Sequence, residues 1–171
     1  MKRWALFLYA VATCIVVLDQ ASKHWVLANF EEYQRVQLLP VLDFVLAYNY
    51  GAAWSFLNNE GGWQRWPFVA ISAVVSVVLV VWIYRLPSHQ RLLAWALTFI
   101  LGGAVGNLYD RVVLGKVVDF ILFYYDGWHF PAFNVADAAI TLGAALLILD
   151  ALLPERQADG SVGADAEQGR K

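Results

Sequence analysis

The segment Pro67–Tyr84 reads PFVAISAVVSVVLVVWIY and contains no charged residue. As a helix, about 20 such apolar residues cross the roughly 30 Å hydrocarbon core of a bilayer. The segment therefore predicts a membrane-spanning helix. The whole chain agrees, because its 171 residues are 60% hydrophobic and its mean hydropathy is +0.54, whereas soluble domains are about half apolar.

Three further apolar segments lie on either side of this one, so we expect four spans, at about residues 4–27, 67–84, 92–110 and 135–153. The first span must tolerate Asp19 and Lys23. The residues beyond Pro154 are charged and rich in Gly and Ala, a composition that does not build a core. We therefore predict a mainly α-helical membrane fold, with one membrane-embedded domain over residues 1–154 and a disordered cytoplasmic tail over 155–171.

The distribution of Lys and Arg predicts the side of each loop, because cytoplasmic loops carry an excess of these residues. Seven lie at the termini and between the second and third spans: Lys2, Arg3, Arg85, Arg91, Arg156, Arg170 and Lys171. Three lie in the other two loops: Arg35, Arg65 and Lys116. Both termini are therefore expected in the cytoplasm, with loops 28–66 and 112–133 on the outer side.

The first outer loop, 28–66, is too long to be a simple connection. It contains two runs of β-forming residues, Val36–Leu39 and Leu42–Asn49, which are typical of strands. We expect a small extracytoplasmic antiparallel sheet within residues 36–57. Val117–Tyr125 is another candidate strand, either part of the same sheet or a flap.

Two aspartates stand beside apolar segments. Asp119 follows the third span, and Asp137 lies about one turn into the fourth. A carboxylate near hydrocarbon is costly unless it is paired or hydrated, so such residues indicate function. Both are expected near the outer interface, where a loop brings them together as a pair that shares one proton. The ionised carboxyl then takes a proton from water while the protonated one polarises a peptide carbonyl, as in an aspartyl peptidase.

Each aspartate also has a structural interpretation. Asn134-Val-Ala-Asp137 matches a capping box, in which Asn134 is the N-cap and the helix dipole favours the acid three residues later. Asp119 also fits a solvated loop residue. Spacing alone leaves these alternatives open.

The third span ends in a polar cluster of Asn107, Asp110 and Arg111, after glycines that permit close helix contact. The cluster is either a helix-packing stripe closed by an interfacial ion pair or part of a substrate-binding site. In the second case Arg111 hydrogen-bonds peptide carbonyls or a lipid phosphate.

Asp19 and Lys23 stand four residues apart on one face of the first helix, which favours a salt bridge over catalysis. Asn49 ends the second run of β-forming residues. It is either a turn residue or a contact with an extended peptide.

Other chemical classes lack their residues in this sequence. The one cysteine, Cys14, excludes an internal disulfide and a cysteine-rich metal site. The three histidines lie in separate regions and form no His-Glu-x-x-His zinc motif. No Gly-x-Ser-x-Gly nucleophile motif is present, and a net charge of −2 gives no indication of nucleic-acid binding.

Together the motifs resemble the lipoprotein signal peptidase family (signal peptidase II) of bacteria. The resemblance covers about residues 15 to 150 and rests on five motifs in order: Asp19-Gln-Ala-Ser-Lys23, Asn49-Tyr-Gly-Ala-Ala-Trp, Gly102-Gly-Ala-Val-Gly-Asn-Leu-Tyr-Asp-Arg111, Val118-Asp119-Phe and Phe133-Asn-Val-Ala-Asp137. It implies an aspartyl endopeptidase that removes signal peptides from bacterial prolipoproteins, cutting just before a cysteine that carries a diacylglyceryl group.

The resemblance also implies roles for individual residues. Asp119 and Asp137 correspond to the catalytic pair. The residues that shape the site or bind substrate correspond to Asp19, Lys23, Asn49, Asn107, Asp110, Arg111 and Asn134. No metal and no cofactor are expected.

With the Lys and Arg distribution, the resemblance places a multi-pass protein in the bacterial cytoplasmic (inner) membrane, with its active site near the periplasmic face. The expected partners are a diacylglyceryl-prolipoprotein substrate and membrane phospholipid, without nucleic acid, and we expect a monomer. The alternative is a small membrane transporter or scaffold in which Asp19, Lys23, Asp119 and Asp137 form an acid relay. Relay acids are spread through the membrane depth, whereas these are all expected in the outward half.

Overall fold

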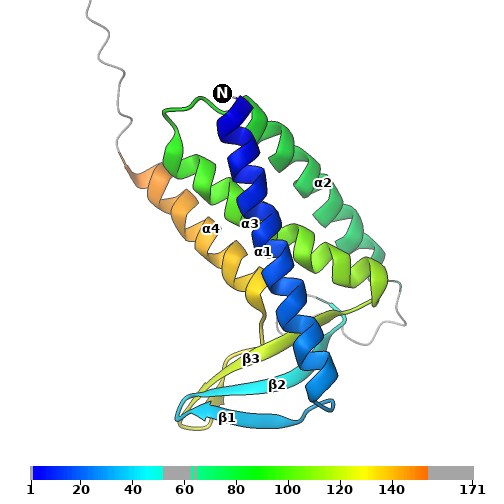
Figure 1. Ribbon diagram of the computed structural model, residues 1–171. Helices are drawn as coiled ribbons and strands as arrows, with labels where there is room; N and C mark the ends of the chain where they lie inside the picture. Colours follow the sequence, from blue (N-terminus) through cyan, green and yellow to red (C-terminus); the bar gives the residue numbers. More distant parts are fainter. Residues whose placement is uncertain (1, 52–62, 64, 154–171) are drawn as a thin grey trace, which may run out of the picture.

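The computed structural model describes residues 2–51, 63 and 65–153 (Figure 1). Its helices are α1 (Lys2–Asn29), α2 (Arg65–Arg85), α3 (Arg91–Val113) and α4 (Val135–Leu152), and its strands are β1 (Arg35–Leu39), β2 (Leu42–Asn49), β3 (Val117–Tyr125) and β4 (Trp128–His129). All four helices are long and apolar enough to cross a membrane, which confirms the predicted four-span fold. The expected tail, 155–171, and the part of the expected sheet over 52–57 lie outside the described residues.

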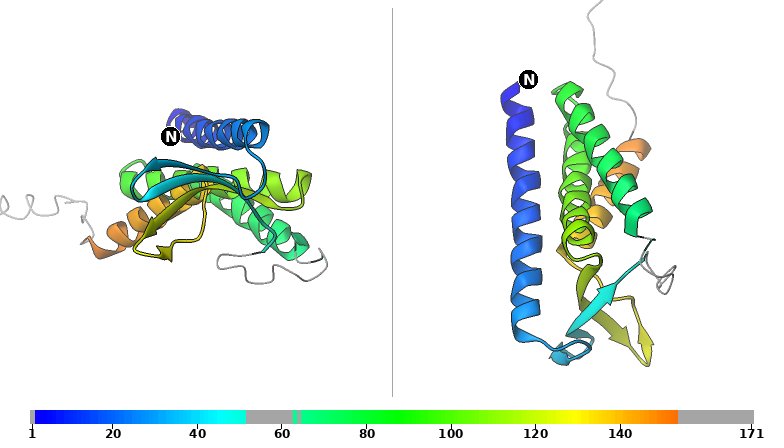
Figure 2. Two further views of the ribbon diagram at one scale, coloured as in Figure 1. Left: turned by 90° about the horizontal axis from the view of Figure 1, so that it is seen from below. Right: turned by 90° about the vertical axis from the view of Figure 1, so that its right-hand side faces the viewer.

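Helix α3 lies at the centre of the bundle and packs against the other three helices. Figure 2 shows α1 on one side of α3, with α2 and α4 on the other side. The beginning of α1 and the end of α4 lie at the same end of the bundle, and the sheet lies at the opposite end (Figure 1). The bundle therefore has one end with a sheet and one end with the described chain ends.

The outer faces of the helices are apolar. Val74 and Val77 of α2 are 63% and 64% exposed, and Ile148 of α4 is 61% exposed. Hydrocarbon solvates such side chains, and the helical backbone satisfies its own hydrogen bonds there. These exposed apolar faces are therefore suited to contact with lipid.

Glycines bring α3 close to its neighbours, as the sequence predicted. A Cβ placed on Gly102 would lie 2.8 Å from the Cβ of Ile15 in α1. A Cβ placed on Gly103 would overlap the carbonyl oxygen of Ala136 in α4 and lie 2.7 Å from Cγ1 of Ile140. Small residues at such points allow helix backbones to approach closely, and here they draw the start of α4 against α3.

The sheet is antiparallel with the strand order β1-β2-β3-β4. Strand β3 pairs with β2, so Val117–Tyr125 is part of the sheet and not a separate flap. The register places Asp119 opposite Ala47, next to an irregularity in β2 between Phe44 and Ala47. The short strand β4 was not predicted.

An apolar cluster joins the sheet to the helices. Val26 of α1 packs with Leu46 of β2 and with Val118 and Phe120 of β3, all of them buried. This contact fixes the start of β3 against the end of α1. Asp119 lies between two members of the cluster, so its position is set on both sides.

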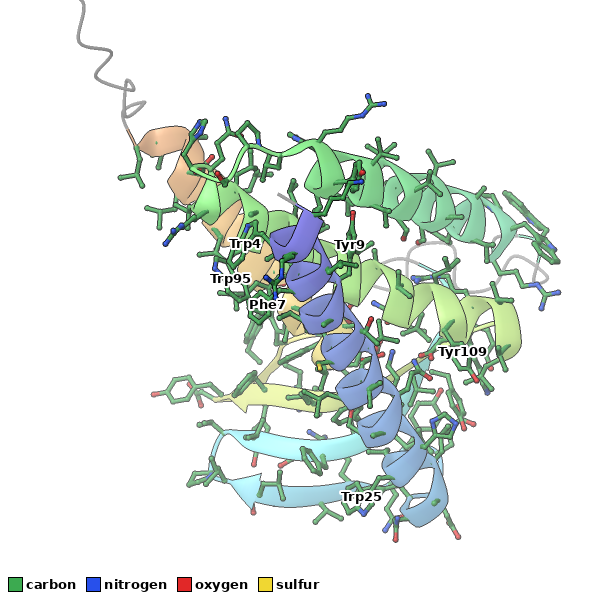
Figure 3. The ribbon with its side chains drawn as sticks, turned by 45° about the horizontal axis from the view of Figure 1, so that its top comes forward. Trp4, Phe7, Tyr9, Trp25, Trp95 and Tyr109 are labelled. Atoms are coloured by element: carbon green, nitrogen blue, oxygen red, sulfur yellow. The ribbon has the colours of Figure 1, made fainter. Side chains whose placement is uncertain are left out.

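The helices are tied together near the other end of the bundle by aromatic contacts. Trp4 and Phe7 of α1 lie 6.3 and 6.1 Å from Trp95 of α3, measured between ring centroids (Figure 3). The hydroxyl of Tyr9 donates to the carbonyl oxygen of Val80 in α2 at 2.8 Å.

Candidate active site

Asp119 and Asp137 meet where β3 passes the beginning of α4. Asp119 lies in β3 and is buried, whereas Asp137 is the third residue of α4 and is half-buried. The two carboxyls are near enough for the charge of Asp137 to act on Asp119. The structure therefore brings the two sequence-predicted aspartates together.

Asn134 connects the two aspartates. Its side-chain oxygen accepts from the backbone N–H of Asp137 at 2.9 Å, and its backbone N–H donates to Asp137 Oδ2 at 3.3 Å, which together form the expected capping box. Its Nδ2 also donates to Asp119 Oδ1 at 2.7 Å. The cap and the pairing are therefore not alternatives, because one residue makes both.

Asn107 of α3 holds Asp137 from another direction. Its Nδ2 donates to Asp137 Oδ1 at 2.8 Å. Its Oδ1 accepts from Lys23 Nζ at 3.0 Å and from Asn134 Nδ2 at 3.2 Å. Both oxygens of Asp137 therefore accept an N–H group.

A buried ion cluster lies behind Asn107. Lys23 Nζ is 2.8 Å from Asp19 Oδ2 and 2.9 Å from Asp110 Oδ2, and none of the three side chains is more than 1% exposed. The predicted salt bridge within α1 is thus present, but it has a second acid from α3. A buried ammonium requires such compensation.

The two acids of this cluster also bind backbone groups near the aspartate pair. Asp19 Oδ1 accepts from the N–H of Ala136 at 2.9 Å, and Asp110 Oδ2 accepts from the N–H of Val118 at 3.1 Å. These bonds connect the cluster to the residue before Asp137 and to the residue before Asp119. The cluster therefore positions both chain segments that carry the pair.

Gln20 was not predicted as a site residue. Its Nε2 donates to Asp110 Oδ1 at 2.8 Å, to Asp19 Oδ2 at 3.1 Å and to the carbonyl oxygen of Gly106 at 3.2 Å. The available signal was a second polar residue beside Asp19 inside an apolar span. The close approach occurs at Gly106, where a Cβ would lie 2.7 Å from Asp19 Oδ2.

Arg111 and Asn49 lie at the edge of this arrangement. The Arg111 guanidinium donates to the carbonyl oxygens of Asn107 and Gly51 at 3.3 and 3.4 Å, and lies 5.4 Å from the ring centroid of Phe68. Asn49 Oδ1 accepts from the Gly51 N–H at 3.1 Å, as in a turn. All nine sequence-predicted residues therefore gather where α1, α3, α4 and the sheet meet.

The pKa of Asp119 is raised from 3.8 to about 7, chiefly by burial and secondly by the negative charge of Asp137. Side-chain hydrogen bonds from Asn134 and Asn49 and the charge of Lys23 oppose the rise. A carboxyl with this pKa holds a proton much of the time at neutral pH. Within residues 2–51, 63 and 65–153, no group of three or more His, Cys, Asp or Glu residues is placed to hold a metal ion.

A family model described as Signal peptidase (SPase) II matches residues 11–153 of the chain. The chain belongs to the signal peptidase II family. It is 50% identical to the lipoprotein signal peptidase of Shewanella halifaxensis over 161 residues, 92% of each chain. It is 54% identical to the lipoprotein signal peptidase of Ectopseudomonas mendocina over 150 residues, 86% of this chain and 89% of the relative.

A solved structure described as a bacterial membrane enzyme has the same fold as this signal peptidase II. The TM-score is 0.77 at 30% sequence identity, covering 85% of this chain and 87% of the other. The comparisons confirm the family predicted from the sequence. The protein is thus a peptidase and a multi-pass protein of the inner membrane, which favours hydrolysis over the transporter or scaffold alternative.

Proposed function

We propose that this signal peptidase II removes the signal peptides of bacterial prolipoproteins, cutting just before a cysteine that carries a diacylglyceryl group. The names of the relatives from Shewanella halifaxensis and Ectopseudomonas mendocina support the substrate class. The observation that carries the proposal for this chain is the linkage of two carboxyls, Asp119 and Asp137, through Asn134.

Asp119 and Asp137 are the proposed catalytic pair. One carboxyl is ionised and takes a proton from a water molecule as the water attacks the scissile carbonyl carbon. The other is protonated and donates a hydrogen bond to the carbonyl oxygen, where negative charge develops. The raised pKa of Asp119 supports a shared proton near neutral pH, and half-buried Asp137 is accessible to water.

The remaining polar residues support the pair. Five residues fix the two carboxyls through a network of hydrogen bonds and ion pairs: Asp19, Lys23, Asn107, Asp110 and Asn134. These contacts are buried or partly buried, and a network of this kind holds catalytic groups in one geometry.

Arg111 and Asn49 are proposed to contact substrate. The Arg111 guanidinium lies beside the pair, and its planar donors suit a peptide carbonyl or a lipid phosphate. An Arg111→Ala enzyme that unfolds in detergent but keeps full specific activity in its folded fraction would assign the residue to structure alone.

The site lies at the sheet end of the bundle, which we propose faces the periplasm, with both termini in the cytoplasm. A prolipoprotein has its signal segment in the membrane and its lipid on the adjacent cysteine, so its scissile bond lies at the same interface. The lipid-facing surfaces of α2 and α4 then contact phospholipid, and a monomer holds the complete set of catalytic groups.

Substrate lipidation tests the proposal. Each acyl CH₂ that is buried on binding contributes up to about 0.8 kcal/mol, so the lipidated precursor should be cleaved at least about tenfold faster than the same precursor without lipid. The measurement is kcat/KM for both forms in one detergent. Equal values for the two forms would contradict a lipoprotein substrate.

A further inference from the structure

Lys23 has a fixed hydrogen-bonding direction that it imposes on its neighbour. Its ammonium group can only donate, and its three acceptors are Asp19 Oδ2, Asp110 Oδ2 and Asn107 Oδ1, at 2.8, 2.9 and 3.0 Å. The side chain is 1% exposed, so water does not replace these partners. The atom that Asn107 turns toward Lys23 must therefore be its oxygen.

With its oxygen toward Lys23, Asn107 has only its NH₂ group to offer Asp137. That group donates to Asp137 Oδ1 at 2.8 Å. A second donor, Asn134 Nδ2, also occupies Asn107 Oδ1 at 3.2 Å. If the Asn107 amide were turned over, its NH₂ group would face two donors, Lys23 Nζ and Asn134 Nδ2. Its oxygen would then face the Asp137 carboxyl, and only a protonated Asp137 could donate a hydrogen bond to it.

The two aspartates are therefore not equivalent. Asp137 accepts an N–H on each oxygen, from Asn107 and from the backbone of Asn134, and such bonds favour a carboxylate. Asp119 also accepts side-chain hydrogen bonds, from Asn134 and Asn49, but it is only 3% exposed, and burial has the larger effect and favours its neutral form. The charged groups that act on Asp119 from the surrounding helices are Asp137 of α4, Lys23 of α1 and Arg111 of α3.

We propose that Lys23 is a positioning residue that locks the Asn107 amide, so that Asp137 carries the negative charge of the pair and Asp119 carries the proton. The inference rests on the proposed function and assigns its two roles. Asp137 takes the proton from water, and Asp119 donates a hydrogen bond to the scissile carbonyl oxygen. Lys23 acts on the pair through Asn107, without touching substrate.

A double-mutant cycle tests whether Lys23 acts through this amide. The variants are Lys23→Met, Asn107→Leu and the two combined, and the readout is the pH dependence of kcat/KM on a lipidated precursor. The pH of the acid limb does not depend on the fraction of folded enzyme. It therefore separates positioning of the pair from simple loss of structure.

We expect Lys23→Met to move the acid limb to higher pH by about one unit or more, because the freed amide no longer favours ionised Asp137. Asn107→Leu should produce a similar shift, and adding Lys23→Met to it should produce only a small further shift, from the loss of the Lys23 charge. Shifts that add would mean that Lys23 acts through its charge alone and would overturn the inference. Reduced activity with unmoved limbs in Lys23→Met would overturn it as well.

A charge-balanced background covers the case in which Lys23→Met does not fold, since it leaves two buried carboxylates without a cation. Lys23→Met with Asp110→Asn removes one cation and one anion, and the new amide can still accept from the N–H of Val118. The same cycle with Asn107→Leu, referenced to Asp110→Asn alone, has the same expected and contradicting outcomes. Wild-type cleavage by Asp119→Asn would overturn the proposed pair itself, whereas additive shifts overturn only the role of Lys23.

Discussion

Asn134 binds both aspartates of the proposed pair with a single side chain. As an N-cap it accepts from the Asp137 N–H, and with its NH₂ group it donates to Asp119. The spacing of Asn134 and Asp137 predicted the first contact, because capping is local. The second contact depends on where β3 lies, so it could not be read from local spacing.

The raised pKa of Asp119 should appear as a pH dependence of stability. The carboxyl has a pKa of 3.8 in the unfolded chain and about 7 when folded, so the folded protein binds more protons between these values. The free energy of unfolding therefore falls as pH rises from about 4 to about 7. Asp119→Asn should weaken this dependence.

The measurement is the unfolding midpoint in detergent at pH 5 and pH 8 for the wild type and Asp119→Asn. The wild type should lose more of its thermal stability between the two values than the variant does. Identical losses in both proteins would show that Asp119 is not protonated in the folded state.

Among the secondary-structure elements, the helices were more predictable from the sequence than the strands of the sheet. Apolar length identified α1 to α4, because a membrane span needs little more than about 20 apolar residues. The pairing of β2 with β3 joins segments far apart in the chain, and β-propensity alone left β3 between a strand and a flap. The two-residue β4 is too short to produce a signal in the sequence.

Gly103 sets the distance between α3 and α4 and supplies a test at this scale. Replacing glycine by alanine inside a helix normally stabilises it by about 1 kcal/mol. Here the new Cβ would meet the Ala136 carbonyl oxygen, and overpacking against backbone destabilises by about 1–3 kcal/mol. Gly103→Ala should therefore lower the unfolding midpoint and, by moving the start of α4, lower peptidase activity.

The control is Val112→Ala on the same helix, where the side chain is 57% exposed and packs little. Its unfolding midpoint and activity should stay close to those of the wild type. A Gly103→Ala enzyme that is more stable than the wild type would show that α3 and α4 are not in close contact at this point.

At the scale of the whole molecule, the polar residues gather at one end of an apolar bundle. The sequence predicted that the nine candidate site residues lie toward the outer side, and it predicted the Asp19–Lys23 pair from its helical spacing. It did not predict that Asp110 and Gln20 complete the same cluster. Those contacts arise from the packing of α1 on α3, which spacing within one helix cannot reveal.

The proposed orientation can be tested with single cysteines in a Cys14→Ser background. Tyr125 of β3 is 73% exposed at the sheet end, and Ser88 is exposed in the turn between α2 and α3. In spheroplasts, whose inner membrane is intact, an impermeant thiol reagent added from outside should label Tyr125→Cys and leave Ser88→Cys unlabelled. The reverse pattern would place the site on the cytoplasmic side, away from an exported substrate.

The proposed joint role of Asp119 and Asp137 in hydrolysis is measured most directly by the cleavage of a lipidated prolipoprotein by Asp119→Asn and by Asp137→Asn. An amide can neither take a proton from water nor share one with the other carboxyl, so each variant should lose at least about a hundredfold in kcat/KM. The matched control is Asp126→Asn in the exposed turn between β3 and β4, which should cleave at the wild-type rate. A folded Asp119→Asn or Asp137→Asn enzyme with a kcat/KM within about tenfold of the wild-type value would show that the two aspartates are not the catalytic pair.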